Sequence, residues 1–222
     1  MLRMPDRGRL PKDLIAGYGR FRRDRYPVER ERLRRLADDG QRPGTLVVAC
    51  SDSRTAPEVV FDARPGELFV VRNVAALVPA YAPDAAAHGV SAALEYGVLA
   101  LGVGSIVVLG HGRCGGIAAA LGPAEPLSAT DFVGTWIAGL RTLASEPAIR
   151  DLPGGPARRT ALERRSIERS VETLRTFPWI EAREADGRLA LRGAWFDVAL
   201  GELHQLTGAG WRPLEVEPPA SA

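Results

Sequence analysis

The sequence is poor in cysteine and lysine and contains no long hydrophobic run. Cys50 and Cys114 are its only cysteines, and Lys12 is its only lysine. Two cysteines are too few for a secreted fold built on disulfides. No apolar run approaches the ~18 residues of a membrane span, and the basic stretch 1–14 has no apolar segment of the kind found in secretory signals. We therefore expect a cytoplasmic protein without a membrane partner.

Neither sign of charge predominates in the chain. Lysine and arginine number 29, aspartate and glutamate number 27, and the net charge is +2. This balance argues against nucleic acid or anionic lipid as the main partner. With 45% hydrophobic and 25% charged residues, the composition is that of a globular domain with a large core. We expect one domain, residues 1–222, with an N-terminal helical arm (1–40), an α/β core (41–206) and a C-terminal tail (207–222).

Residues 11–39 predict two amphipathic helices that are separated at Pro27. The apolar residues before the proline recur at helical spacing: Leu10, Leu14, Tyr18 and Phe21. The segment is rich in arginine and glutamate, so at least one of its faces contacts water. The arm either lies on the surface of its own domain or wraps a partner subunit.

Short, continuous apolar runs predict strands buried on both faces of a parallel sheet. These runs span residues 45–50, 68–71 and 105–111. Helices are expected at 86–102, 115–121, 132–143 and 159–175, a short strand at 178–180 and an edge strand at 188–196. Strands that alternate with helices indicate an α/β fold with a mostly parallel central sheet. We expect strand order 2-1-3-4 plus an antiparallel edge strand, with helices flanking the sheet.

Residues that suit a metal ion follow the first and third predicted strands. The first strand leads into Cys50-Ser-Asp-Ser-Arg54, and the third leads into His111-Gly-Arg-Cys114. In strand order 2-1-3-4 these ends are neighbours where the order reverses, which is where such sheets bind ligands. Two thiolates and one imidazole form a donor set that prefers zinc. The helix predicted after Cys114 would also stabilise its thiolate.

Three protein ligands leave a fourth position on the metal, as in catalytic zinc sites. Asp52 could fill that position and close the site, or Arg54 could hold Asp52 in a bidentate pair and leave the position to water. The cysteines could instead be inert core thiols or a redox pair, although they form no C-x-x-C motif, and the histidine could be a simple hydrogen-bonding residue. The convergence of all these residues on two adjacent strand ends favours zinc.

The two motifs, C-x-D-x-R and H-x-x-C, resemble those of the β-class carbonic anhydrases. Further segments resemble other parts of the family: residues 65–73 its second strand, 91–96 the helix before its third strand, and 193–198 with 201–203 its last strand and closing helix. The resemblance extends from about residue 10 to residue 206. It implies a zinc lyase that reversibly hydrates carbon dioxide to bicarbonate and a proton, by attack of zinc-bound hydroxide on carbon dioxide.

The resemblance also implies a role for each motif residue. Cys50, His111 and Cys114 would bind one Zn²⁺ per subunit. Asp52 would accept a hydrogen bond from the zinc hydroxide, and Arg54 would keep Asp52 ionised and off the metal.

A narrow apolar pocket for carbon dioxide and bicarbonate is implied beside the zinc. By spacing from the motifs, its residues are Gln41, Phe69, Val74 and Tyr96, with Gly115 added to the substrate-binding set. Family pockets are assembled from two subunits, so Gln41, Phe69 and Tyr96 would face a partner's zinc. The resemblance thus implies a homodimer, with a tetramer or larger assembly as the alternative, and an arm that wraps the partner.

Two positions depart from the family pattern. Closed, bicarbonate-inhibited members carry a tryptophan three residues before the first cysteine, where this chain has Val47, and this favours the open, plant-like form. Ala76 stands where the family usually has asparagine. Rival functions on the same residues are a non-catalytic zinc or bicarbonate sensor, a hydrolase of carbon disulfide or carbonyl sulfide, and a thiol redox enzyme. The Asp52–Arg54 pair and the missing tryptophan argue against the sensor.

Overall fold

The computed structural model describes residues 8–216, and the predicted segments that fall in 1–7 and 217–222 lie outside the described residues. The chain divides into two compact units, Met1–Gln41 and Arg42–Ala222. Among residues 8–216, no helix is both long enough and apolar enough to cross a membrane. The assignment of both units to one domain stays a prediction.

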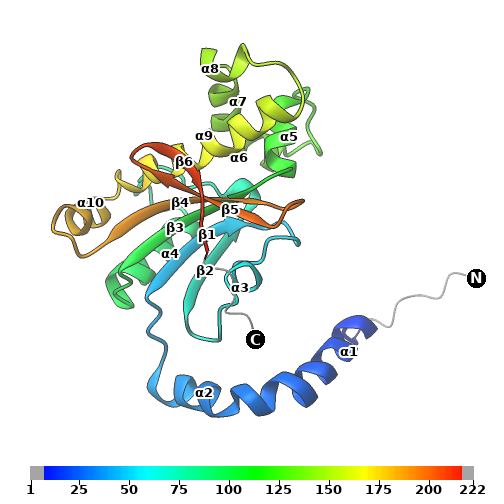
Figure 1. The fold of residues 1–222 in the computed structure, drawn as a ribbon, viewed down its shortest axis with the longest axis vertical. Helices are drawn as coiled ribbons and strands as arrows, with labels where there is room; N and C mark the ends of the chain where they lie inside the picture. The colour runs from blue at the N-terminus through cyan, green and yellow to red at the C-terminus, as the bar shows by residue number, and fades with distance from the viewer. Residues whose placement is uncertain (1–7, 217–222) are drawn as a thin grey trace, which may run out of the picture. The chain divides into compact units, whose positions relative to one another are not determined.

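The first unit is one continuous helical segment (Figure 1). It consists of α1 (Lys12–Arg20), the π-helical turn η1 (Phe21–Arg25) and α2 (Tyr26–Asp39). The predicted break at Pro27 is wrong, because Pro27 lies in the first turn of α2. A proline ring clashes with the carbonyl of the preceding helical turn, and the wide π-helical turn lies where that clash would fall. No residue of α1, η1 or α2 is buried.

The second unit is built on a six-stranded sheet of order β2-β1-β3-β4-β5-β6. The strands are β1 (Thr45–Cys50), β2 (Leu68–Asn73), β3 (Ser105–His111), β4 (Ala190–Asp197), β5 (Glu202–Thr207) and β6 (Gly210–Pro213). The first four strands are parallel, and β5 and β6 are antiparallel to their neighbours. The α/β class and the order 2-1-3-4 are therefore confirmed, as is an antiparallel edge.

One strand and one helix expected near the C-terminus need correction. The strand expected at the edge, residues 188–196, is the interior strand β4, which pairs with both β3 and β5. The helix implied around residues 201–203 is instead the start of β5. Gly201, with φ +73°, turns the chain back so that Leu203 pairs with Phe196. The following strand β6 lies inside the segment expected as a tail.

Helices connect and cover the strands. They are α3 (Pro57–Val60), the 3-10 turn η2 (Val74–Ala76), α4 (Gly89–Glu95), the π-helical turn η3 (Tyr96–Ala100), α5 (Gly115–Leu121), α6 (Phe132–Trp136), α7 (Ala138–Ala144), α8 (Pro147–Arg150), α9 (Pro156–Leu174) and α10 (Pro178–Ala185). The four predicted helices are confirmed. The strand predicted at 178–180 is wrong, since Pro178 occupies the first turn of α10, a position where its missing N–H costs nothing.

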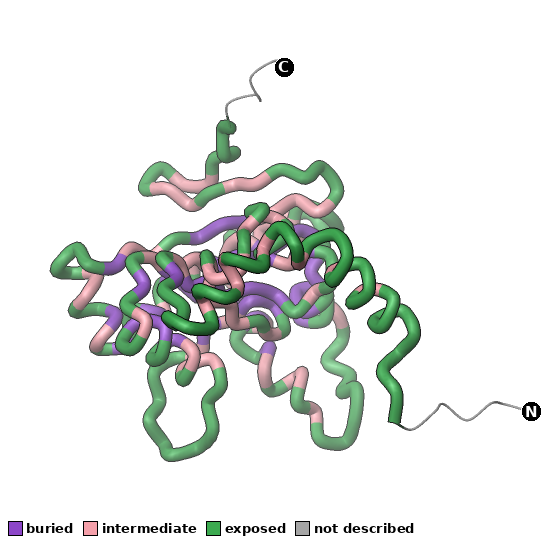
Figure 2. Tube along the Cα trace, turned by 90° about the horizontal axis from the view of Figure 1, so that it is seen from below, coloured by how far each residue is buried: buried purple, intermediate pink, exposed green. Residues whose placement is uncertain are grey.

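The core lies around the central strands, whose buried positions are purple in Figure 2. On one face of the sheet, Leu46 and Val108 pack in a cluster with side chains of α4 and α9. Helix α9 approaches the sheet closely because β3 has Gly110 there: a Cβ at this residue would lie 2.5 Å from Cδ1 of Ile167. A second core cluster contains Cys50, Cys114 and residues of α5 and α7. The carboxyl ends of β1 and β3 are therefore enclosed by packed helices.

Candidate metal centre

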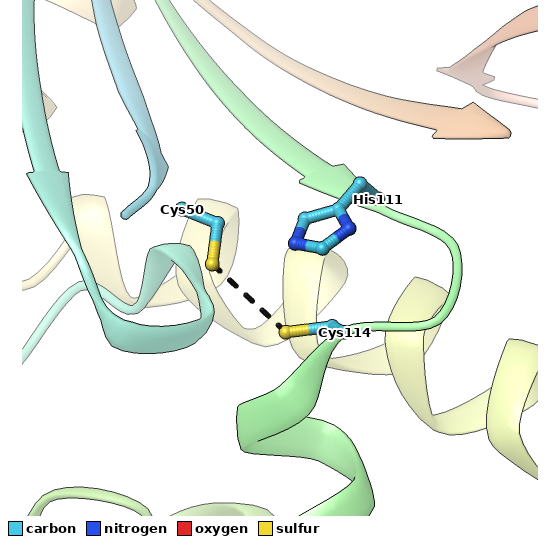
Figure 3. Close-up of side chains that lie close together, drawn as sticks. All are labelled: Cys50, His111 and Cys114. Atoms are coloured by element: carbon cyan, nitrogen blue, oxygen red, sulfur yellow. Dashed lines mark hydrogen bonds between the residues drawn. The ribbon is translucent and has the colours of Figure 1, made fainter. Parts of the chain in front are cut away.

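Three side chains of metal-ligand type converge at the carboxyl ends of β1 and β3 (Figure 3). Cys50 is the last residue of β1, His111 is the last residue of β3, and Cys114 immediately precedes α5. The parallel pairing of β1 with β3 places these ends side by side. Their ligand atoms all lie within 4.8 Å of one another. The residues are 5%, 2% and 3% exposed, so the centre is buried.

His111 is oriented by its own neighbour. Its Nδ1 lies 2.9 Å from the carbonyl oxygen of Gly112. A carbonyl only accepts hydrogen bonds, so Nδ1 carries the proton and the lone pair is on Nε2. That Nε2 is buried and has no hydrogen-bond partner among the described residues. A buried imidazole nitrogen with a free lone pair, next to two thiols, fits a zinc ion and suits neither Ca²⁺ nor Mg²⁺, which take oxygen ligands.

The two thiols interact directly, with 4.0 Å between their sulfur atoms. The hydrogen bond from Cys114 lowers the pKa of Cys50, against the opposing effect of burial. The same contact and burial raise the pKa of Cys114. Cysteine binds a metal ion as the thiolate, so a divalent cation bound by both sulfurs would require both to be deprotonated.

Asp52 and Arg54 form a bidentate ion pair next to the centre. Arg54 donates from Nε to Oδ1 of Asp52 over 2.9 Å and from Nη2 to Oδ2 over 2.7 Å. The guanidinium holds the pKa of Asp52 well below its usual range. Oδ2 of Asp52 lies 3.9 Å from Nε2 of His111. Arg54 therefore makes the bidentate pair with Asp52 that is one of the two arrangements expected from the sequence.

Arg72 is a residue of the site that the sequence analysis misses. Its Nε donates to the carbonyl of Cys50 over 2.8 Å, and its Nη2 donates to the carbonyl of Asp52 over 2.6 Å. It thereby ties the turn after β1 to the neighbouring strand β2. A signal was available, because Arg72 and Asn73 are polar residues at the end of the strand that pairs with β1.

Glu163 is the second residue that the sequence analysis misses. It is only 2% exposed and lies on α9, where it accepts hydrogen bonds from the backbone N–H of Cys114 and from Nε1 of Trp195. Burial raises the pKa of its carboxyl group. The helical spacing was the available signal. Glu163 lies three and four positions before the buried residues Ser166 and Ile167, so it lies on the buried face of the same helix.

Four of the five predicted substrate-binding residues fall into three groups. Val74 lies beside the centre: a Cβ on Gly116 of α5 would be 3.0 Å from its Cγ1. Phe69 and Tyr96 contact each other, with ring centroids 5.8 Å apart, and Tyr96 is 52% exposed. Gln41 is exposed at the end of the first unit.

Gly115 is the exposed first residue of α5, and a Cβ there would meet no atom within 4 Å. Neither its substrate-binding role nor that of the other pocket residues is tested by these positions, and each stays a prediction.

The fold and the centre define an α/β protein with a buried thiol–imidazole cluster that could hold a metal ion. A family model described as carbonic anhydrase matches residues 45–203. A carbonic anhydrase of Pseudomonas aeruginosa is 38% identical over 201 residues, which are 90% of each chain.

Two sets of solved structures are similar as well. The β-carbonic anhydrase CcaA superimposes with a TM-score of 0.82 at 29% identity, covering 92% of both chains. Tetrameric β-carbonic anhydrases of Sordaria macrospora give a TM-score of 0.70 at 28% identity over 87% of this chain and 92% of theirs. The chain belongs to the β-class carbonic anhydrases, as the sequence motifs predict.

Proposed function

We propose that this carbonic anhydrase binds one Zn²⁺ per subunit through Sγ of Cys50, Nε2 of His111 and Sγ of Cys114, and hydrates carbon dioxide reversibly there. Family membership implies the reaction. The observation that supports zinc is the trio of buried, soft donor atoms within 4.8 Å of one another. Three protein donors leave room for a water molecule, as catalytic zinc requires.

Zinc bound at this site would supply a Lewis acid that makes a water nucleophilic near neutral pH, an effect for which carbonic anhydrases are themselves the standard example. The protein's own part is to orient that water. Asp52 is ionised because Arg54 holds it, and its Oδ2 lies 3.9 Å from the His111 donor atom. Oδ2 would accept a hydrogen bond from the attacking water. Arg54 donates to both carboxylate oxygens and would keep Asp52 from coordinating the metal.

The substrate pocket would be apolar, as carbon dioxide requires. We assign Phe69, Val74 and Tyr96 to its walls, with Gly115 at its edge. Gln41 would donate a hydrogen bond to an oxygen of carbon dioxide or bicarbonate. The position of Val74 supports its assignment to the pocket wall, since it is 38% exposed and adjoins the α5 residues that follow Cys114.

We infer that the functional unit is a homodimer, with a tetramer of two dimers as the alternative. Phe69 pairs with Leu46, four residues before Cys50, so it lies about 13 Å along the strand from its own centre at ~3.3 Å per residue. At that distance from its own metal centre, Phe69 is better suited to line the pocket of a second subunit. The exposed apolar side chains of the first unit, such as Leu14 and Tyr18, also indicate a protein partner. Related enzymes from Sordaria macrospora are tetramers.

We assign the enzyme to the open, plant-like form. Val47 of β1 stands where closed members carry tryptophan. It is fully buried and packs in a cluster with Ala49 and Leu109. The bidentate hold of Arg54 on Asp52 supports the same assignment.

The experiment that tests the metal is removal and return of zinc. We expect one zinc per subunit in the purified protein, loss of carbon dioxide hydration on chelation, and recovery when zinc is returned. A thiol redox enzyme would instead lose activity on oxidation and keep it on chelation. Activity that survives complete removal of zinc would contradict the proposal.

A further inference from the structure

Glu163 is a buried acid without a cationic partner. It is 2% exposed, and among the described residues it takes part in no ion pair. Its two closest partners are both hydrogen-bond donors: the N–H of Cys114 at 3.3 Å from Oε1, and Nε1 of Trp195 at 3.1 Å from Oε2. Burying a carboxyl group in this way is costly unless its hydrogen bonds are satisfied. The free-energy cost of burying the Glu163 carboxyl group indicates that this residue has a function.

The contact with Cys114 falls in a strained turn. The turn from His111 to Cys114 contains Arg113 at φ +59°, a left-handed conformation that costs a non-glycine residue about 1–2 kcal/mol. Cys114 is the N-cap residue of α5, and its side chain makes no capping hydrogen bond. Oε1 of Glu163 holds the backbone of Cys114 at this point. A side chain from α9 thus contacts the backbone of the residue whose thiol lies 4.0 Å from that of Cys50.

Trp195 gives the carboxylate a fixed second anchor. Its ring is contacted by the Arg164 guanidinium at 4.7 Å and by the His204 ring at 5.2 Å between centroids. It also lies against the turn, because a Cβ on Gly112 would be 3.1 Å from the Trp195 ring. The carboxylate is thus held between β4, α9 and the turn that carries two of the proposed metal ligands.

We propose that Glu163 is a positioning residue for the metal centre: it fixes Cys114 through the backbone, without binding the metal itself, and tight zinc binding requires both of its carboxylate oxygens. This inference rests on the proposed zinc centre. Groups that orient metal ligands typically contribute a factor of ten to a hundred in metal affinity.

The amide of glutamine cannot replace this carboxylate. Both partners of Glu163 donate hydrogen bonds, whereas glutamine has one accepting oxygen and one donating NH₂ group. In Glu163→Gln, either Cys114 N–H or Trp195 Nε1 faces another donor. The same helix offers a matched control, because Glu168 accepts a hydrogen bond from Nε1 of Trp211 over 2.8 Å, away from the metal centre.

The test measures binding of Zn²⁺ by competition with a chromophoric chelator, and the sulfur-to-metal charge-transfer band of the Co²⁺ form. We expect Glu163→Gln to weaken zinc binding about 10- to 100-fold and to shift the cobalt band, while Glu168→Gln changes neither. Adding Trp195→Phe to Glu163→Gln removes the conflicting donor, so zinc affinity should partly recover. A purely structural role predicts a further loss in the double variant.

Several results would overturn the inference: unchanged zinc affinity in Glu163→Gln, equal losses in Glu163→Gln and Glu168→Gln, or additive losses in the double variant. If Glu163→Gln does not fold, Trp195→Phe provides the test, with Trp211→Phe as its control. Trp195→Phe should then weaken zinc binding and Trp211→Phe should not, and equal affinities would count against the inference. Failure of the unmodified protein to bind zinc would instead refute the proposed function.

Discussion

The ion pair with Arg54 determines both the charge and the orientation of the Asp52 carboxylate. Both oxygens of Asp52 accept hydrogen bonds from Arg54, and Oδ1 also accepts from the Arg54 backbone N–H at 3.0 Å. The carboxylate is therefore ionised and fixed, but it is only 3.9 Å from the proposed ligand atom of His111. In the proposed function, Oδ2 would accept a hydrogen bond from the water held at this position.

Asp52→Asn should lower kcat for carbon dioxide hydration by about 100-fold or more, while zinc content stays at the unmodified level. The reason is that the asparagine amide can place its NH₂ group, a hydrogen-bond donor, where Oδ2 of Asp52 would accept a hydrogen bond from the water. The chain contains a matched control, because Asp186 forms the same type of pair with Arg188 two residues later, far along the chain from the site. Asp186→Asn should leave kcat unchanged. Near-normal turnover in Asp52→Asn would refute the role given to Asp52.

The three proposed metal-binding residues could be found in the sequence because each one adjoins a strand end that the apolar pattern marks. Asp52 and Arg54 could be predicted for the same reason. Glu163 could not be assigned to the site, since its contact with Cys114 spans 49 residues and depends on how α9 packs on the sheet. Arg72 could have been assigned, because the predicted order 2-1-3-4 already places the end of its strand beside that of β1.

Helices and strands were predictable where they are buried. The runs that form β1 and β3 match the predicted bounds, because an apolar run between turn residues has few other ways to be buried. The hairpin of β5 and β6 is only half-buried, and its sequence carries no such run. The first turn of α10 begins with Pro178 and contains Trp179 and Ile180, which resemble a strand when read alone.

The junction between α5 and η2 offers a test of packing beside the centre. A Cβ on Gly116 would lie 2.9 Å from the Cβ of Ala75, so Gly116→Ala should lower the free energy of unfolding by about 1–3 kcal/mol. Gly115→Ala is the neighbouring control, because a Cβ there meets nothing within 4 Å. It should be neutral or gain up to about 1 kcal/mol from helix propensity. Urea unfolding at fixed zinc concentration measures both, and equal values would contradict the close contact of α5 with η2.

In the proposed homodimer, the first unit would contact the partner subunit. None of its helices buries a residue within the chain, yet Tyr18 and Phe21 stack with centroids 6.3 Å apart and continue an apolar face from Leu14. Amphipathic helices owe most of their stability to the packing of their apolar face against another part of the protein or a partner. The sequence motifs could not predict the size of the assembly, since the faces that meet another subunit are not defined by spacing within one chain.

Leu14→Glu should therefore shift the enzyme toward smaller species and reduce its activity in parallel. Glutamate is a good helix former, so the helix itself should persist. Lys12→Glu changes charge on a different face of α1 and should leave the assembly intact. Light scattering after gel filtration measures the mass of each. An unchanged mass for Leu14→Glu would contradict the assignment of this face to a subunit contact.

Stopped-flow hydration of carbon dioxide, followed with a pH indicator on protein of measured zinc content, tests the proposed reaction at this centre. We expect activity at about pH 7 and about pH 8.5, in proportion to bound zinc and abolished by its removal. Activity at the higher pH alone would show that Asp52 closes the centre at low pH and would refute the open form. Zinc bound in full with no hydration at either pH would contradict the proposed function itself.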